Sequence, residues 1–220
     1  MTYIKTALII IILYTSALYS QESTDINFQD LYAQMKDKYS SAYPKHFEAY
    51  IKGKIVQRQI DTIPAKSYTK TKDDIKLKFS FTQGGKPSII LENVDSFYRN
   101  MFSVFEGALE TIGFYTLVGN SSSYDSLSKK FTFESLEEIK NKYEITLRAK
   151  GENQNYSVVY TVDKESLLIE QAEYYNKKSK IYDVNISYEN IENYTLPKII
   201  KYKSSDGKVN SEIEFTDIKF

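Results

Sequence analysis

Hydrophobic and polar positions follow two different periods along the chain, and the change of period divides it into segments. Between residues 24 and 44 the apolar residues recur at intervals of three and four, which is the spacing of one helical stripe. Thr24 or Asp25 can cap this helix, and Pro44 ends it because the residue before a proline is pushed out of the helical region. The pattern predicts an amphipathic helix of about 18 residues whose apolar face packs on another part of the protein.

After Pro44 the period changes to two. Apolar and polar residues alternate over residues 47–55 and again over 75–82, which predicts two half-buried strands, and Gly84-Gly85 then turns the chain into a third. The alternation returns in KKFTFES, KYEITLRAK, NYSVVYTVD, SLLIEQAEYYN, KIYDVNISYEN, LPKIIKYKSS and SEIEFTDIKF. Short connections cannot carry parallel crossovers, so we expect an antiparallel meander of at least six strands.

Three further segments complete the predicted architecture. Residues 94–112 carry a broad apolar face at helical spacing, residues 119–130 have the composition of a loop, and ESLEEIKNK is typical of a helical turn with solvated acidic residues. An antiparallel sheet with one apolar face and two amphipathic helices predicts an α+β fold. In this fold the sheet curves into a half-barrel and the helices cover its concave side as a lid.

The first 20 residues contain Lys5, a short apolar run and then small polar residues. A helix over residues 7–18 rises about 18 Å, which is too short for a hydrocarbon core of about 30 Å. The arrangement is typical of a cleaved secretory signal peptide, and a retained membrane anchor is the alternative. We therefore expect a signal peptide over 1–20 and a single domain over 21–220.

Composition then narrows the compartment and the partners. The chain has no cysteine, which excludes disulfides and the acylated cysteine of a bacterial lipoprotein, so we expect a soluble periplasmic protein without stable membrane insertion. The formal net charge is zero and no basic stripe is present to neutralise phosphates, so nucleic acid is not an expected partner. The length suits one domain, which we expect to be a monomer.

The sequence offers little support for catalysis or metal binding. His46 is the only histidine, and no nucleophile elbow of the form G-x-S-x-G accompanies it. Glu134, Glu137 and Glu138 are the candidates for a glycosidase pair, but they fit a solvated acidic face better. Without cysteine a metal site would depend mainly on carboxylates. We expect a binding protein rather than an enzyme, with no cofactor and no metal.

Aromatic residues are the class in excess, with 20 Tyr and 12 Phe. Most alternate along strands, where core packing explains them. The apolar stripe within residues 94–112 is the exception, because a helix laid over a curved sheet either seals a core or covers a cavity. Methionine and phenylalanine there provide an adaptable surface for acyl chains. The candidate residues of an acyl-chain cavity are Phe47, Ile51, Phe79, Phe81, Phe97, Met101, Phe102, Phe105, Leu109 and Tyr160.

Short motifs follow one another through the C-terminal half in a fixed order. They are Val162-Asp163-Lys164, Tyr174-Tyr175-Asn176, residues 184–188, Leu196-Pro197 and Phe215-Thr216-Asp217-Ile218. In this order they resemble the periplasmic lipoprotein-carrier (LolA/LolB-like) superfamily, and the first helix leading into KHFEAYIKGKI is similar as well. The resemblance implies a curved antiparallel sheet with a helical lid over an apolar cavity for acyl chains. The chain departs from the family pattern at residues 94–112.

The expected function is therefore that of an exported envelope protein that binds lipid acyl chains or lipoproteins in an apolar cavity and carries them through the periplasm. One alternative is a protein-binding or regulatory module of the envelope that uses a sheet edge or the lid surface. The other is an outer-membrane β-barrel. Phe220 at the end of the chain is typical of such barrels, but Glu212 and Glu214 would then face the lipid.

Overall fold

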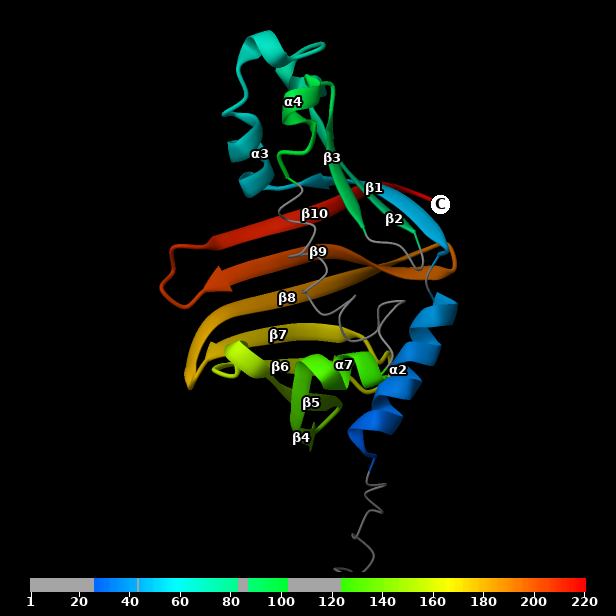
Figure 1. Ribbon diagram of the computed structural model, residues 1–220. Coiled ribbons are helices and arrows are strands. Elements are labelled where there is room, and N and C mark those ends of the chain that lie inside the picture. The colour runs from blue at the N-terminus through cyan, green and yellow to red at the C-terminus, as the bar shows by residue number, and fades with distance from the viewer. Residues whose placement is uncertain (1–25, 43, 83–86, 103–123) are drawn as a thin grey trace, which may run out of the picture.

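One curved antiparallel sheet dominates the protein, seen here in a computed structural model that describes residues 26–42, 44–82, 87–102 and 124–220 (Figure 1). Within this part of the chain the sheet has ten strands in the order β3-β2-β1-β10-β9-β8-β7-β6-β5-β4. The N-terminal strands are β1 (His46–Lys52), β2 (Lys76–Thr82) and β3 (Ser88–Glu92). The meander consists of β4 (Phe131–Ile139), β5 (Lys142–Ala149), β6 (Tyr156–Asp163), β7 (Ile169–Asn176), β8 (Ser179–Ile191), β9 (Tyr194–Ser204) and β10 (Asn210–Lys219).

Helices pack on one face of this sheet and at its ends. The helical segments are α2 (Phe28–Ala42), α3 (Lys54–Ile60), α4 (Ser96–Arg99) and α7 (Tyr124–Lys130), with 3-10 turns η1 (Ala65–Ser67), η2 (Lys72–Asp74) and η3 (Gly151–Asn153). Leu31 and Met35 of α2 and Leu127 of α7 are buried in the same apolar cluster as the strands. We call the face of the sheet that contributes to this cluster the inner face.

Alternation along the strands produces the inner face, as the sequence predicts. In β1 and β2 every second residue is buried, and the register pairs Phe47 with Phe81 and Ala49 with Phe79. The intervening residues lie on the opposite face, where Glu48 and Lys78 form an ion pair at 2.7 Å. The predicted α+β class, with a curved antiparallel sheet and helices against it, is confirmed, and so is the meander, which runs from β4 to β10.

The N-terminal strands join the meander through one pairing, that of β1 with β10. Ile51 lies opposite Phe215 in this register, and Glu48 lies opposite Lys219. The ring of Phe79 then contacts that of Phe215 edge-on, with 5.4 Å between centroids. The last strand of the chain is thus sealed between the first strand and β9, and the apolar cluster continues across the junction.

Gly53 ends β1 at a point where the backbone passes close to β10. Its φ of 147° is one that side-chain-bearing residues rarely adopt, and an added Cβ would lie 2.1 Å from the carbonyl oxygen of Glu212. Helix α3 begins directly afterwards and buries Val56 and Ile60, which are one helical turn apart. The strand expected over 47–55 therefore stops at Lys52, and Ile55 belongs to a helix instead.

The segment ESLEEIKNK is a strand and a turn, and the prediction of a helical turn there is wrong. Residues 131–139 form β4, which pairs with β5 along its length with a bulge between Phe133 and Ser135. Two acidic residues form ion pairs with basic residues, Glu134 with Arg148 of β5 and Glu138 with Lys164 of the β6–β7 turn. Cross-strand pairing has overridden the helical preference of the glutamates.

Two further expectations change. Residues 124–130 were expected in a loop but form α7, whose Leu127 is buried. The long helix expected over 94–112 is a short helix α4 at its start, followed by a turn at Asn100, whereas residues 103–123 lie outside the described residues. Asn100 favours such an end because its side chain competes with the helical backbone for hydrogen bonds.

Substitution of Gly53 by alanine should destabilise the protein by at least about 3 kcal/mol, because it combines a disfavoured φ with a collision against backbone. Gly207→Ala is the matched control, since Gly207 has a φ of 71° but nothing within 4 Å of the added Cβ. Its expected cost is about 1 kcal/mol. Urea unfolding measures both free energies, and equal losses in the two variants would contradict the close approach of β1 to β10.

Candidate ligand-binding face

Cross-strand register aligns inner-face residues into rows that run across the meander. The longest row crosses from β4 to β10, and each member lies opposite the next on the adjacent strand. It consists of Leu136, Ile145, Tyr160, Ala172, Val184, Tyr202 and Ser211. A second row lies two residues further along the strands and consists of Phe133, Leu147, Val158, Tyr174, Tyr182 and Ser204. The apolar character of these rows makes the inner face the candidate surface for an apolar ligand.

Three tyrosines place hydroxyl groups near the middle of this mostly apolar face. Tyr160 and Tyr202 belong to the first row and Tyr174 to the second. Burial, reinforced by the neighbouring hydroxyls of Tyr160 and Tyr202, raises the pKa of Tyr174 well above its ordinary value. Burial alone raises the pKa of Tyr202 in the same direction. Tyr174 and Tyr202 are therefore un-ionised at neutral pH, and an un-ionised phenol can both donate and accept a hydrogen bond.

The two residues between Tyr160 and Tyr202 in the first row are small. Ala172 has none of its surface exposed and Val184 only 3 %. Because side chains of one row stand side by side on the sheet, the short ones leave the long tyrosine rings room to lean toward one another. The interaction of Tyr174 with both Tyr160 and Tyr202 is consistent with this convergence.

Beside Tyr202, β10 contributes Ser211, which is its direct cross-strand partner. The hydroxyl oxygen of Ser211 is buried and has no hydrogen-bond partner within the described part of the chain. A buried hydroxyl without a partner costs about 1–3 kcal/mol, so most such groups in folded proteins are paired. Ser211 thus places one unsatisfied polar atom beside the three tyrosines.

Aromatic side chains close the inner face at its β4 end. Phe28 of α2 stacks on Phe133 of β4 with parallel rings at a centroid distance of 4.8 Å. Tyr124 of α7 meets both Phe28 and Tyr32 at 5.9 Å. Burial raises the pKa of Tyr32 to about 12. These contacts hold the beginnings of α2 and α7 together against the edge of the sheet.

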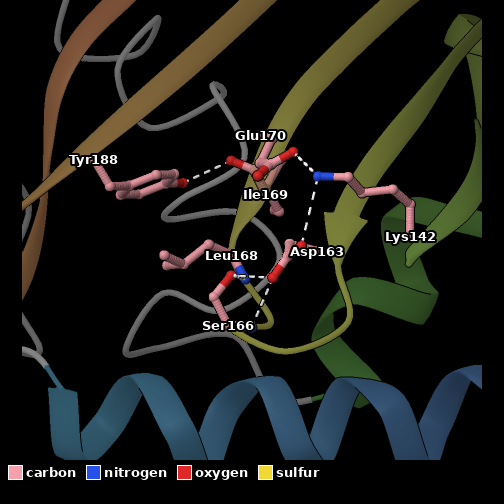
Figure 2. Close-up of polar contacts among 7 residues, drawn as sticks. All are labelled: Lys142, Asp163, Ser166, Leu168, Ile169, Glu170 and Tyr188. Carbon is pink, nitrogen blue, oxygen red and sulfur yellow. Dashed lines mark hydrogen bonds and ion pairs between the residues drawn. The ribbon is translucent and has the colours of Figure 1, made fainter.

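A polar network fixes the turn between β6 and β7, which lies beside α2 (Figure 2). Lys142 of β5 forms ion pairs with Asp163, at 3.5 Å, and with Glu170. The other carboxylate oxygen of Asp163 accepts hydrogen bonds from the backbone N–H and the hydroxyl of Ser166, both at 2.8 Å. The backbone N–H of Ser166, with its hydroxyl and Lys142 in support, holds the pKa of Asp163 below its usual value. The turn is therefore rigidly defined.

Helix α2 is attached to this same turn. The Nζ of Lys38 donates a hydrogen bond to the carbonyl oxygen of Glu165 at 2.5 Å. Further along the sheet, the Tyr188 hydroxyl donates to the carbonyl oxygen of Ile169 at 2.7 Å, which ties β8 to the start of β7 (Figure 2). Helix α2 is thus held at two points, by its aromatic residues near β4 and by Lys38 at the β6–β7 turn.

The candidate residues named from the sequence fall into separate places. Phe47, Phe79 and Phe81 are buried together, with Phe47 at 5.5 Å from each of the other two rings, and Ile51 is buried on the same strand as Phe47. Tyr160 lies on β6, and four strands separate β6 from β1 in the sheet. The strand candidates therefore share one continuous apolar core, in which Tyr160 lies four strands away from Phe47 and Ile51.

The candidates from the expected helix behave differently from one another. Phe102 is buried, and Met101 packs partly buried against the core. Phe97 is 85 % exposed and meets Tyr98 edge-on, so its expected place on an inward-facing stripe is wrong. Phe105 and Leu109 lie outside the described residues.

Sequence reasoning missed Tyr174, Ser211 and the small Ala172 as members of the same site. Their signal was present in the alternation, because each occupies an apolar position of its strand. The sequence pattern does not show which residues of neighbouring strands lie opposite one another. This register is what brings the three residues together.

The residues considered for catalysis are dispersed. His46 is exposed at the start of β1, where its Nδ1 lies 2.9 Å from the hydroxyl of Thr82. Glu134 and Glu138 are each engaged in an ion pair. Within the described residues, no group of three or more histidine, cysteine, aspartate or glutamate side chains is placed to hold a metal ion. In the same residues no helix combines the length and apolar character needed to cross a membrane.

Comparison with known proteins gives structural similarity only. Neither a protein-family model nor a curated protein sequence matches the chain. Among solved structures, the chain is similar to an outer membrane lipoprotein-sorting protein domain from Vibrio parahaemolyticus, at 11% identity and a TM-score of 0.46, over 87% of this chain and 91% of that one. A DUF1329 family protein from Desulfovibrio piger is similar over the same shares of the two chains, at 13% identity and a TM-score of 0.46.

Alkaline pH should destabilise the protein through its buried tyrosines. A tyrosine whose folded-state pKa is raised keeps its proton while the unfolded chain loses it, so its contribution to stability is complete below about pH 10 and is lost as pH rises toward the folded value. For Tyr32 this loss extends to about pH 12. Each such tyrosine lowers the free energy of unfolding by up to about 1.4 kcal/mol per pH unit in this range.

Urea unfolding at several pH values, together with tyrosinate absorbance, measures this effect. Tyr202→Phe should make the alkaline decline shallower, and Tyr156→Phe is the control because Tyr156 is exposed. A decline that is identical in the two variants would show that Tyr202 is not buried as described.

Loss of the Asp163 carboxylate should loosen the β6–β7 turn and, with it, α2. We expect Asp163→Ala to lower the free energy of unfolding by about 1–2 kcal/mol and to speed amide hydrogen exchange in α2. Asp206→Ala is the matched control, since Asp206 accepts from Ser204 and from the Lys208 backbone in the β9–β10 turn. That turn lies at the opposite end of the strands, so exchange in α2 should not change. Equal exchange in both variants would argue against the attachment of α2 to the turn.

Proposed function

We propose that the protein is an exported envelope protein that binds lipid acyl chains, free or as part of a lipoprotein, along its inner face and carries them through the periplasm. The observation that supports this most directly is the apolar row that crosses the meander from Leu136 to Ser211 with the small Ala172 at its centre. The members of this row are apolar apart from the hydroxyl groups of Tyr160, Tyr202 and Ser211, of which the last two lie at its β10 end. No catalytic residue is required.

The physical driving force is sufficient for such a role. A buried methylene group contributes about 0.8 kcal/mol, so a long acyl chain gains roughly 10 kcal/mol before the costs of ordering and association are subtracted. The remaining free energy corresponds to reversible binding, which a carrier needs in order to release its cargo.

The proposed periplasmic location rests on the chain itself. Residues 1–20 have the charge, length and apolar run of a cleaved signal peptide, and the complete lack of cysteine fits a protein that needs neither disulfides nor a lipid anchor. We propose a single domain from residue 21 onward that acts as a monomer.

One observation favours a protein partner as a second role. Strand β4 is an edge strand, since no strand pairs with its outer side in the described part of the chain, and Phe133 and Ile139 on it are 40 % and 42 % exposed. Exposed strand edges accept added strands from partner proteins. A carrier that delivers cargo also needs a surface that its donor or acceptor can contact.

The test of lipid binding is the substitution Ala172→Leu. If an acyl chain lies over Ala172, the larger side chain should weaken binding of diphenylhexatriene at least tenfold while the free energy of unfolding changes by less than about 1 kcal/mol. Fluorescence titration measures the affinity, and native mass spectrometry of the purified protein detects any lipid that it carries. Thr161→Leu, on the opposite face of the neighbouring β6, is the matched control and should leave binding unchanged.

Two outcomes would contradict the proposal. Failure of the unmodified protein to bind the probe or to carry lipid would exclude it. A loss of about 2–3 kcal/mol of stability in Ala172→Leu, without any effect on affinity, would show that residue 172 lies in a packed core rather than beneath a ligand.

A further inference from the structure

Four hydroxyl groups of the inner face come from nearby positions of its two rows. Tyr160 and Tyr202 stand in the same row with only Ala172 and Val184 between them, and Tyr174 stands beside Ala172 two residues along β7. A side-chain hydrogen bond links Tyr174 to Tyr160, and Tyr202 is close enough to affect Tyr174 electrostatically. Tyrosines from three different strands therefore present their polar ends to a common region.

Ser211 provides an independent indication that this region is built for a polar ligand. It lies directly opposite Tyr202, and its buried hydroxyl has no partner among the residues that the structure describes. An unpaired hydroxyl on an inner face is unfavourable for folding, and a ligand with a hydrogen-bonding group removes the penalty.

The surroundings select an uncharged ligand group. In the described residues, no lysine, arginine, aspartate or glutamate side chain is buried. The buried polar side chains in this part of the chain are those of serines, Ser67 and Ser204. Transfer of a carboxylate or phosphate from water to such a region without a cation is strongly unfavourable. Tyrosine and serine hydroxyls can donate to a carbonyl oxygen and accept from a hydroxyl, so they suit esters, amides and alcohols.

We propose that Tyr160, Tyr174, Tyr202 and Ser211 bind the uncharged ester and hydroxyl groups of an acylglycerol whose acyl chain lies along the apolar row. This inference rests on the proposed function and deepens it, because it assigns the class of lipid. The apolar row supplies affinity for any acyl chain. The hydroxyls of the three tyrosines and of Ser211 distinguish a neutral glycerol ester from a free fatty acid with the same acyl chain.

Competition between matched lipids tests the proposal. Monooleoylglycerol and sodium oleate are each used to displace diphenylhexatriene from the full protein at neutral pH. The unmodified protein should bind the ester about tenfold more tightly than the carboxylate. Tyr174→Phe and Ser211→Ala should each weaken ester binding about fivefold and leave the affinity for diphenylhexatriene unchanged.

The matched control is Tyr175→Phe. Tyr175 follows Tyr174 on the same strand but points to the opposite face, where its hydroxyl donates to Glu173 at 2.6 Å. Its substitution should change neither affinity. Because tyrosine-to-phenylalanine changes preserve the ring, circular dichroism and urea unfolding should confirm that each variant folds.

The outcomes separate the two proposals. Equal affinities for the ester and the carboxylate would overturn the proposal that these side-chain hydroxyls recognise an ester. Ester binding that is unchanged in both Tyr174→Phe and Ser211→Ala would overturn it as well. In either case the acyl-binding function stands. A lack of binding of diphenylhexatriene and of both lipids would overturn the function itself and the inference with it. A selective loss of ester affinity in the two variants supports both.

Discussion

The pairing of β1 with β10 is the contact on which the rest of the structure depends. It joins strands from opposite ends of the chain, so its formation costs chain entropy. Burial of the apolar surface at the junction must offset this loss. Without it, β10 would be an open edge and the rings of Phe47 and Phe79 would lose their contact with the meander through Phe215. The requirement for glycine at position 53 follows from this pairing, because the chain must turn away from β10 within one residue of its last contact.

The sheet that results has two faces with different chemistry. The outer face carries paired charges, such as Glu173 with Lys180 at 2.8 Å. These pairs make the face hydrophilic but add little to the free energy of unfolding. The inner face carries apolar side chains together with hydroxyl groups. The two attachments of α2, at Phe133 and at the β6–β7 turn, fix this helix relative to the inner face without using residues of the central row. The residues that anchor the helix are thus distinct from those proposed to contact a ligand.

Much of the fold could be predicted because the period-two alternation of the meander is strong and its turns are short. The errors arose where tertiary contacts override local preference: the glutamates of β4 lie in a strand because the whole segment pairs with β5, and Gly53 stops a strand whose alternation continues into Ile55. The candidate site was less accessible. Alternation identified Tyr160 as an inner-face residue, but only the register shows that Ala172 and Val184 separate it from Tyr202. Phe97 was misjudged because a helix of four residues does not extend the stripe that the longer pattern implied.

The composition of the central row is difficult to explain by stability alone. A valine at position 211 would suit a strand better than serine and would remove a buried hydroxyl that has no partner among the described residues. Phenylalanine at position 174 would keep the ring contacts and avoid the burial of a phenol. Folding gains nothing evident from the Ser211 hydroxyl, and the Tyr174 hydroxyl is satisfied by a hydrogen bond with another inner-face tyrosine, Tyr160. Polar groups of this kind are expected where binding requires them, because the penalty that they impose on the unliganded protein is returned as affinity and selectivity when a complementary group arrives.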